Sequence, residues 1–350
     1  MQIKRVGLDL AKASIQVHAV DRHDAVVMKR SIKRSELLKL FVDRPACLIG
    51  MEACAGAHYW ARELSRLGHT VRLMAPKHVK PYLQGQKNDA NDAAAICEAV
   101  SRPKMRFVAV KSVAQQDVQA LHRIRSQCVE QRTAKVNLIR GLLAEYGIVI
   151  AQQVNNLRRA LVDLLEDAEN GLTMSFRDLL AGLREDLAYL DHRIAELTQR
   201  IERHVAAHEP ARRLLALPGV GPMTASALCA TVGDATAFAN GRQLAAFLGL
   251  TPRQHSTGGK PKLLGIHKQG DSYLRGLLVH GARAVQRMAA KKTDHRSTWL
   301  NDLSKRRHKN IATVAQANKT ARIAWVILAK GETYRTDFVR RLTPDAPALG

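Results

Sequence analysis

The N-terminal part of the chain is divided into short segments with the period or length of β-strands. Along residues 14–20, Ile15, Val17 and Ala19 alternate with other residues on one face. Further strands are expected over residues 3–10, 25–32, 47–51 and 70–74, and a helix over 57–67 that ends at Gly68. Strands joined by a crossover helix predict an α/β domain with a partly parallel sheet.

Asp9 lies near the end of the expected strand 3–10, and Glu52 directly follows the expected strand 47–51. Active groups in open α/β sheets gather at strand ends, so we expect these two acids to meet. Asp89 and Asp92 are three residues apart, so they share one face of a helical turn, where two like charges are unfavourable without a cation. Carboxylate oxygens suit Mg²⁺, and two such ions hold the attacking and leaving oxygens of a phosphodiester displacement.

Each acid taken alone also has an ordinary structural interpretation. Asp9 and Glu52 would face solvent, because side chains alternate along a strand. An Asn or Asp would cap a helix expected over residues 93–100; Asp89 could be that cap, and Asp92 would only complement the helix dipole. The four acids in this order are stronger evidence for a metal site than any one of them.

The chain is strongly basic, with a net charge of +24 and a pI near 10.3. An excess of this size indicates a polyanionic partner, although a merely soluble basic protein is the alternative. Aromatic residues are only 4% of the chain, which argues against a protein that binds single strands by stacking. The 5 cysteines form no C-x-x-C pair, and no signal peptide or membrane span is recognised, so a bacterial cytoplasmic protein with reduced thiols is expected.

Long helices are expected from about residue 112 onward. A heptad seam runs through Leu183, Leu187, Leu190, Ile194, Leu197 and Ile201. It would pair two protomers or form a hairpin with a helix at 113–145, and the sequence does not decide between them. A third, mostly helical region begins near Ala211, and its last strong helix is expected over 311–330. The predicted divisions are 1–110, 111–208, 209–335 and a tail at 336–350.

Several sequence blocks resemble transposases of the insertion sequence 110 family, particularly the group typified by insertion sequence 1111. The motifs Gly7-Leu8-Asp9-Leu10-Ala11-Lys12, Met51-Glu52-Ala53-Cys54 and Lys87-Asn88-Asp89-Ala90-Asn91-Asp92 look like its DEDD motifs. The resemblance continues through the blocks that begin at Leu217, Phe247, His255, Lys268 and Ala317, so it covers nearly the whole chain.

The resemblance implies a RuvC/RNase H-like N-terminal domain, a helical coiled-coil region and a mostly helical C-terminal transposase domain. It implies that Asp9, Glu52, Asp89 and Asp92 bind Mg²⁺, with Mn²⁺ as an alternative ion. It also implies a serine in the C-terminal domain that acts on DNA, and a structured guide RNA that pairs with element ends and target.

Ser256 is the serine that fits this role. It lies in a polar segment with Gly258, Gly259, Arg253 and Lys260, where glycines allow close approach to a phosphate and cations balance its charge. A hydroxyl becomes a useful nucleophile only with a base, a metal or a cationic environment, and no base is identified. A flexible polar loop is the ordinary interpretation, and Thr257 is the alternative hydroxyl.

Further residues are predicted to contact nucleic acid. The turn 218–222 looks like a helix–hairpin–helix turn, whose backbone amides would hold a phosphate, although a plain interhelical turn is the alternative. A basic run containing Arg283, Arg287, Lys291, Lys292 and Arg296 would follow the backbone or form a solvated helix face. The full set is Lys12, Lys87, Gly219, Gly221, Arg253, Lys260, Lys268, Arg275, Lys305, Arg306, Arg307, Lys319 and Arg322.

The sequence therefore predicts a DNA transposase–recombinase that breaks and rejoins DNA at a composite centre of four acids and one serine. Double-stranded DNA, a guide RNA and further copies of the chain, in a dimer or tetramer, are the expected partners. One alternative is a RuvC-like structure-selective nuclease that uses water as its nucleophile. Another is a nucleic-acid-binding protein without catalytic activity.

Overall fold

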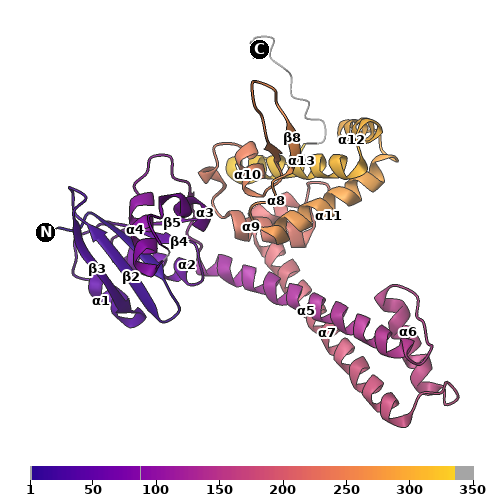
Figure 1. Cartoon of the computed structure of the whole chain (residues 1–350). Helices are drawn as coiled ribbons and strands as arrows, with labels where there is room; N and C mark the ends of the chain where they lie inside the picture. Colours follow the sequence, from indigo (N-terminus) through magenta and orange to yellow (C-terminus); the bar gives the residue numbers. More distant parts are fainter. Residues whose placement is uncertain (1, 87, 336–350) are drawn as a thin grey trace. The chain divides into compact units, whose positions relative to one another are not determined.

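The computed structural model describes residues 2–86 and 88–335 (Figure 1). The chain divides between Val113 and Ala114 into two compact units. Lys87 and the predicted tail at 336–350 lie outside the described residues. The predicted division into three domains and a tail remains a prediction.

The N-terminal unit is built on a six-stranded mixed sheet in the order β3-β2-β1-β4-β5-β6. Strand β1 is parallel to β4, and β4 is parallel to β5, whereas the remaining neighbours are antiparallel. The strands are β1 (Arg5–Leu10), β2 (Ser14–Val20), β3 (Val26–Lys33), β4 (Leu48–Glu52), β5 (Thr70–Met74) and β6 (Phe107–Val108). The partly parallel α/β sheet predicted from the sequence is confirmed.

Helices cover both faces of this sheet. On one face, apolar side chains such as Leu8 and Met51 form a core with α1 (Leu37–Phe41) and α2 (Ala57–Arg66). On the other face lies α4 (Asp89–Ala99). The short elements η1 (Arg34–Glu36), α3 (Pro76–Val79) and η2 (Lys80–Tyr82) connect these parts.

Two glycines allow α4 to lie directly on the strand backbone. A Cβ atom on Gly7 of β1 would lie 2.1 Å from the Ala93 carbonyl oxygen and 2.4 Å from the Cys97 backbone nitrogen. A Cβ atom on Gly50, which pairs with Gly7 across β1 and β4, would lie 2.8 Å from Cβ of Val100. Only glycine fits this separation, so the two positions set how closely α4 approaches the sheet.

The second unit begins with three helices, α5 (Val113–Ala144), α6 (Val154–Glu166) and α7 (Met174–Ala207). Helices α5 and α7 run alongside each other in opposite directions (Figure 1). Leu190, Ile194 and Leu197 of the heptad seam pack on Cys128 of α5. Arg125 Nε donates to Thr198 Oγ1 over 2.7 Å, and Arg132 pairs with Asp191. Of the two interpretations of the seam, the structure has the hairpin within one chain.

The rest of this unit is mostly helical and has a large apolar core, with a smaller cluster where α11, α12 and α13 meet. Helices α9, α11 and α13 contribute Leu228, Leu278 and Ala321 to the large core. The elements are α8 (Glu209–Leu214), α9 (Pro222–Val232), η3 (Ala235–Ala237), α10 (Gly241–Phe247), β7 (Pro252–Gln254), β8 (Leu263–Ile266), α11 (Ser272–Ala289), α12 (His295–Arg306) and α13 (Lys309–Lys330). In the part of the chain that the structure describes, no helix has the length and apolar character needed to cross a bilayer.

Candidate active site

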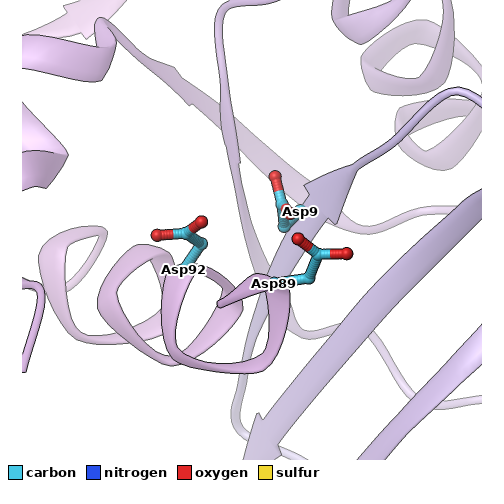
Figure 2. Close-up of side chains that lie close together, drawn as sticks. All are labelled: Asp9, Asp89 and Asp92. Carbon is cyan, nitrogen blue, oxygen red and sulfur yellow. The ribbon is translucent and has the colours of Figure 1, made fainter. Parts of the chain in front are cut away.

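Three of the four predicted acids come together in the N-terminal unit. Asp9 lies near the end of β1, and Asp89 and Asp92 lie in the first turn of α4. One carboxylate oxygen from each lies within 4.8 Å of the others, and Figure 2 shows the three side chains grouped where the strand meets the helix. We call these three residues the acidic cluster.

The position of Asp9 follows from the strand period. Residues i and i+2 of a strand share a face, so Asp9 lies on the same side of β1 as Gly7, which contacts α4. Arg5 of β1 pairs with Glu98 near the far end of α4 over 3.6 Å. Helix α4 therefore runs antiparallel to β1, and its first turn lies at the end of the strand beside Asp9.

The first turn of α4 is capped by Asn88, whose Oδ1 accepts a hydrogen bond from the Asn91 backbone N–H over 2.8 Å. The interpretation of Asp89 as the cap is therefore wrong, and the helix begins at Asp89 rather than at Ala93. Asp92 also lies in the first turn. The positive end of the helix dipole favours both carboxylates there and offsets part of their mutual repulsion.

Glu52 occupies the matching position on the neighbouring parallel strand. Leu8 pairs with Met51, so Asp9 and Glu52 follow paired residues at the ends of β1 and β4. Burial first, and then the charges of Glu52 and Asp9, raise the pKa of the Cys54 thiol, so both acids lie near that side chain. Glu52 is not part of the three-residue acidic cluster.

The acidic cluster suits a hard divalent cation. Three carboxylates gathered at one point supply oxygen ligands of the kind that Mg²⁺ prefers. Among the described residues, no lysine or arginine forms an ion pair with Asp89 or Asp92, so their repulsion is not offset in that way. A divalent ion would relieve this repulsion.

A cation that sequence reasoning missed lies beside the two strand ends. The Arg34 guanidinium donates to the Ala11 carbonyl over 2.8 Å and lies over the Trp60 ring, with 5.4 Å to its centroid. Its charge lowers the pKa of Cys54, against the larger raising effects of burial and the two acids. Nothing in the local sequence around Arg34 indicated this position, because it depends on how η1 packs beside β1.

Ser256 lies in the second unit, on an exposed hairpin formed by β7 and β8 that we call the serine hairpin (residues 252–266). Its Oγ accepts hydrogen bonds from Gln254 Nε2 over 2.9 Å and from the Lys262 backbone N–H over 3.2 Å. Thr257 instead forms an isolated bridge with Lys260 at the hairpin turn. The segment that contains Ser256, for which a flexible polar loop was the alternative interpretation, thus connects the two strands of a ribbon.

Predicted nucleic-acid contacts fall into two structural groups. Exposed side chains are Lys12, Arg253, Lys260, Lys268, Lys305, Arg306, Arg307 and Arg322. Others also have roles inside the fold: Arg275 Nη1 donates to the Leu248 carbonyl over 3.3 Å, and Lys319 Nζ lies 4.4 Å from the centroid of the Trp299 ring. Arg296, predicted as part of the basic run, is buried.

The glycines of the predicted phosphate-binding turn differ from each other. A Cβ atom on Gly219 would lie 2.8 Å from the Gly281 carbonyl oxygen of α11, and one on Gly281 would lie 1.9 Å from the Gly219 oxygen. Gly219 is therefore explained by close packing of the turn on α11. Gly221 is exposed with open space around it, so only this glycine keeps the geometry expected of a phosphate contact.

Comparisons with known proteins cover both units. A family model described as transposase IS116/IS110/IS902 family matches residues 211–297. A second family model, for DEDD transposases of the IS110 type and described as a transposase, matches residues 6–148.

Individual relatives match nearly the whole chain. A probable family 20 transposase of Pseudomonas aeruginosa is 52% identical over 96% of this chain and 99% of its own length. The transposase for insertion sequence element IS1111A of Coxiella burnetii is 44% identical, over 95% of this chain and 92% of its own length. The transposase for insertion sequence element IS1328 of Yersinia enterocolitica is 39% identical, over 94% and 98%.

Proposed function

Because the chain belongs to the IS110 family of insertion-sequence transposases, we propose that its acidic cluster binds Mg²⁺ and acts on a DNA phosphodiester. The observation that carries this proposal is the meeting of Asp9, Asp89 and Asp92 within 4.8 Å. Glu52, at the end of the adjacent strand, would complete the set of four acids.

The residues of the N-terminal unit would hold and orient this centre. When bound, Mg²⁺ would neutralise charge on the phosphate oxygens and stabilise the leaving oxygen. Asp9 is held by the sheet, whereas Asp89 and Asp92 are held by a capped helix turn, so the ligands need little rearrangement. Arg34 would limit the excess negative charge beside Glu52.

We further propose that Ser256 is the nucleophile of strand exchange. Its Oγ would lose its proton to solvent and form a bond to phosphorus as the bond to the leaving deoxyribose oxygen breaks. That oxygen would take up a proton from solvent, and the new phosphoserine ester would conserve a phosphodiester for rejoining. The two donors to Oγ, from Gln254 and Lys262, would stabilise the developing alkoxide. Thr257 is less suited, because it takes part in the hairpin turn.

Guide RNA and self-association belong to the same proposal. The positive charge of the chain supports binding of both DNA and a structured RNA. The seam of α7 is used within the chain, so protomers would associate through other surfaces. Protein freed of nucleic acid should recombine DNA only after the element's RNA is added, and recombination without RNA would contradict guidance.

Two variants and one control test the catalytic assignment. Asp89→Asn with Asp92→Asn should abolish Mn²⁺ binding, measured by calorimetry. It should also reduce cleavage by more than the roughly 10–100-fold that is typical when a residue hydrogen-bonded to a metal ligand is changed. Ser256→Ala should retain metal binding and lose joining on the order of 10⁴-fold or more. The control Asp43→Asn changes an exposed acid outside the cluster and should leave both unchanged.

The outcomes separate the proposal from its alternatives. A Ser256→Ala protein that still cleaves DNA with water would favour a structure-selective nuclease. Strand exchange that persists in Mg²⁺ after Asp9→Ala with Asp92→Ala would show that the acidic cluster is not catalytic.

A further inference from the structure

A group of cationic and aromatic side chains lies at α12 and α13, within the second unit. Arg296 is in the first turn of α12, and Trp299 follows it by one turn. Lys319 and Arg322 are three residues apart on α13, so they lie on neighbouring positions of one helix face. We call Arg296, Lys319 and Arg322 the cationic cluster.

Arg296 is the unusual member because its charged group is buried and incompletely paired. The residue is only 7% exposed. Its Nη2 donates to the Tyr334 hydroxyl, and its guanidinium carbon lies 4.9 Å from the centroid of the Tyr334 ring. Its Nε and Nη1 are buried without a hydrogen-bond partner among the described residues. Burying hydrogen-bond donors without an acceptor costs free energy, so we expect an acceptor to bind at these two nitrogens.

Asp294, the residue that caps α12, does not supply that acceptor. Asp294 feels the charge of Arg296, but hydrogen bonds from Ser297 are the main cause of its lowered pKa. Its Oδ1 accepts from the Ser297 N–H over 3.2 Å, and its Oδ2 accepts from the Ser297 hydroxyl over 2.6 Å. The Asp294 carboxylate is thus engaged in capping α12.

Lys319 lies near two other cations, Arg296 and Arg322. Its Nζ lies 4.4 Å from the centroid of the Trp299 ring. Burial first, and then the charges of Arg296 and Arg322, lower the pKa of Lys319. No ion pair joins any of the three cations to a carboxylate in the described part of the chain. An anion bound between them would turn this repulsion into attraction.

We propose that Arg296, Lys319 and Arg322 form a binding site for one phosphodiester of nucleic acid, and that Tyr334 covers Arg296 until the phosphate binds. Phosphate oxygens accept hydrogen bonds from guanidinium and ammonium groups, which suits the donors present. Tyr334 lies in residues 331–335, which form no helix or strand. Its hydroxyl accepts the hydrogen bond from Arg296 Nη2 that a phosphate oxygen would accept in its place. This site rests on the proposed action on DNA and adds a positioning contact to it.

Binding without catalysis tests the site separately from the acidic cluster. A labelled DNA duplex and an RNA hairpin of equal length are titrated in EDTA at several salt concentrations, and anisotropy is measured. Lys319→Gln and Arg322→Gln should each weaken binding and reduce the slope of log K against log salt by about 1. The control Lys330→Gln removes an exposed charge from the end of the same helix and should keep the slope.

The two probes identify which nucleic acid uses the site. A reduced slope with DNA alone, with RNA alone or with both supports a phosphodiester site and names its source. Unchanged slopes with both probes would overturn it. Because binding is measured in EDTA, without the divalent cation that the acidic cluster would need, the result does not depend on metal-supported catalysis, and a failure of the catalytic proposal remains distinguishable.

Arg296 and Tyr334 provide a second, independent test. Arg296→Met removes the unpaired donors while keeping the apolar length, so the unfolding temperature should hold or rise while affinity for nucleic acid falls. A lower unfolding temperature with unchanged affinity would make Arg296 purely structural. Tyr334→Phe removes the competing hydroxyl and should tighten binding, whereas equal or weaker binding would contradict the covering role.

Discussion

The acidic cluster and the serine hairpin differ in how the fold holds their functional side chains. Asp9 extends from a strand in which Val6 and Leu8 are fully buried, and the helix that carries Asp89 lies directly on Gly7. Ser256 lies on a two-stranded ribbon outside the apolar core, where Leu263 is 65% exposed. Substitutions beside the acidic cluster should therefore lower the unfolding free energy of its unit, whereas substitutions in the serine hairpin should have only local effects.

The largest effect is expected where α4 contacts the sheet. Gly7→Ala would place a methyl group against the Ala93 and Cys97 backbone, so helix and sheet must separate. We expect a loss of about 3 kcal/mol in unfolding free energy, measured by denaturant titration, with loss of metal binding. Gly141→Ala, in α5 where nothing lies within 4 Å, should instead stabilise by roughly 0.5–1 kcal/mol. Equal effects at the two positions would contradict the close packing of α4.

An intermediate effect is expected at the cap of α4. Asn88→Ala removes the hydrogen bond to the Asn91 N–H and should cost about 1 kcal/mol of stability. Because the first turn carries Asp89 and Asp92, metal affinity should fall as well. Asn240→Ala removes the comparable cap of α10, where Asn240 Oδ1 accepts hydrogen bonds from the Arg242 and Gln243 N–H groups. It should cost similar stability and leave metal affinity unchanged.

The smallest effect on stability is expected in the serine hairpin. Gly259 has φ +75° with open space around it, so Gly259→Ala introduces backbone strain of about 1 kcal/mol without a clash. A lone two-stranded ribbon opens locally, so the global unfolding temperature should not change, while strand joining should decrease. A clear drop in unfolding temperature would show that the hairpin is coupled to the core of its unit.

Local patterns were sufficient for two strands of the large sheet and for part of the site, whereas β6, β7 and β8 were not predicted. The alternation along 14–20 and the apolar segment at 70–74 gave β2 and β5 at their observed bounds. The three-residue spacing of Asp89 and Asp92 predicted that they share one helical turn, and both lie in the first turn of α4. The start of α4 was predicted too late, because Asn88 was not recognised as the cap.

Long-range packing accounts for what the sequence could not predict. The need for glycine at Gly7 and Gly50 arises only when a helix from residues 89–99 packs on them. The burial of Arg296 interrupts a run that otherwise has the pattern of a solvated helix face. The ribbon around Ser256 depends on pairing across a Gly-Gly turn, which its polar composition did not distinguish from a loop.

The glycine contact beneath α4 has a consequence for selectivity among cations. No layer of side chains separates the helix backbone from β1 at Gly7, so the spacing of these two backbones does not change with side-chain rotamers at that contact. Mg²⁺ requires strict octahedral geometry at about 2.0–2.1 Å, whereas Ca²⁺ accepts longer and more variable contacts from adaptable ligands. A site whose strand and helix keep a fixed spacing favours Mg²⁺ over the larger Ca²⁺. The close contact of the two backbones would therefore contribute to selection by ionic radius.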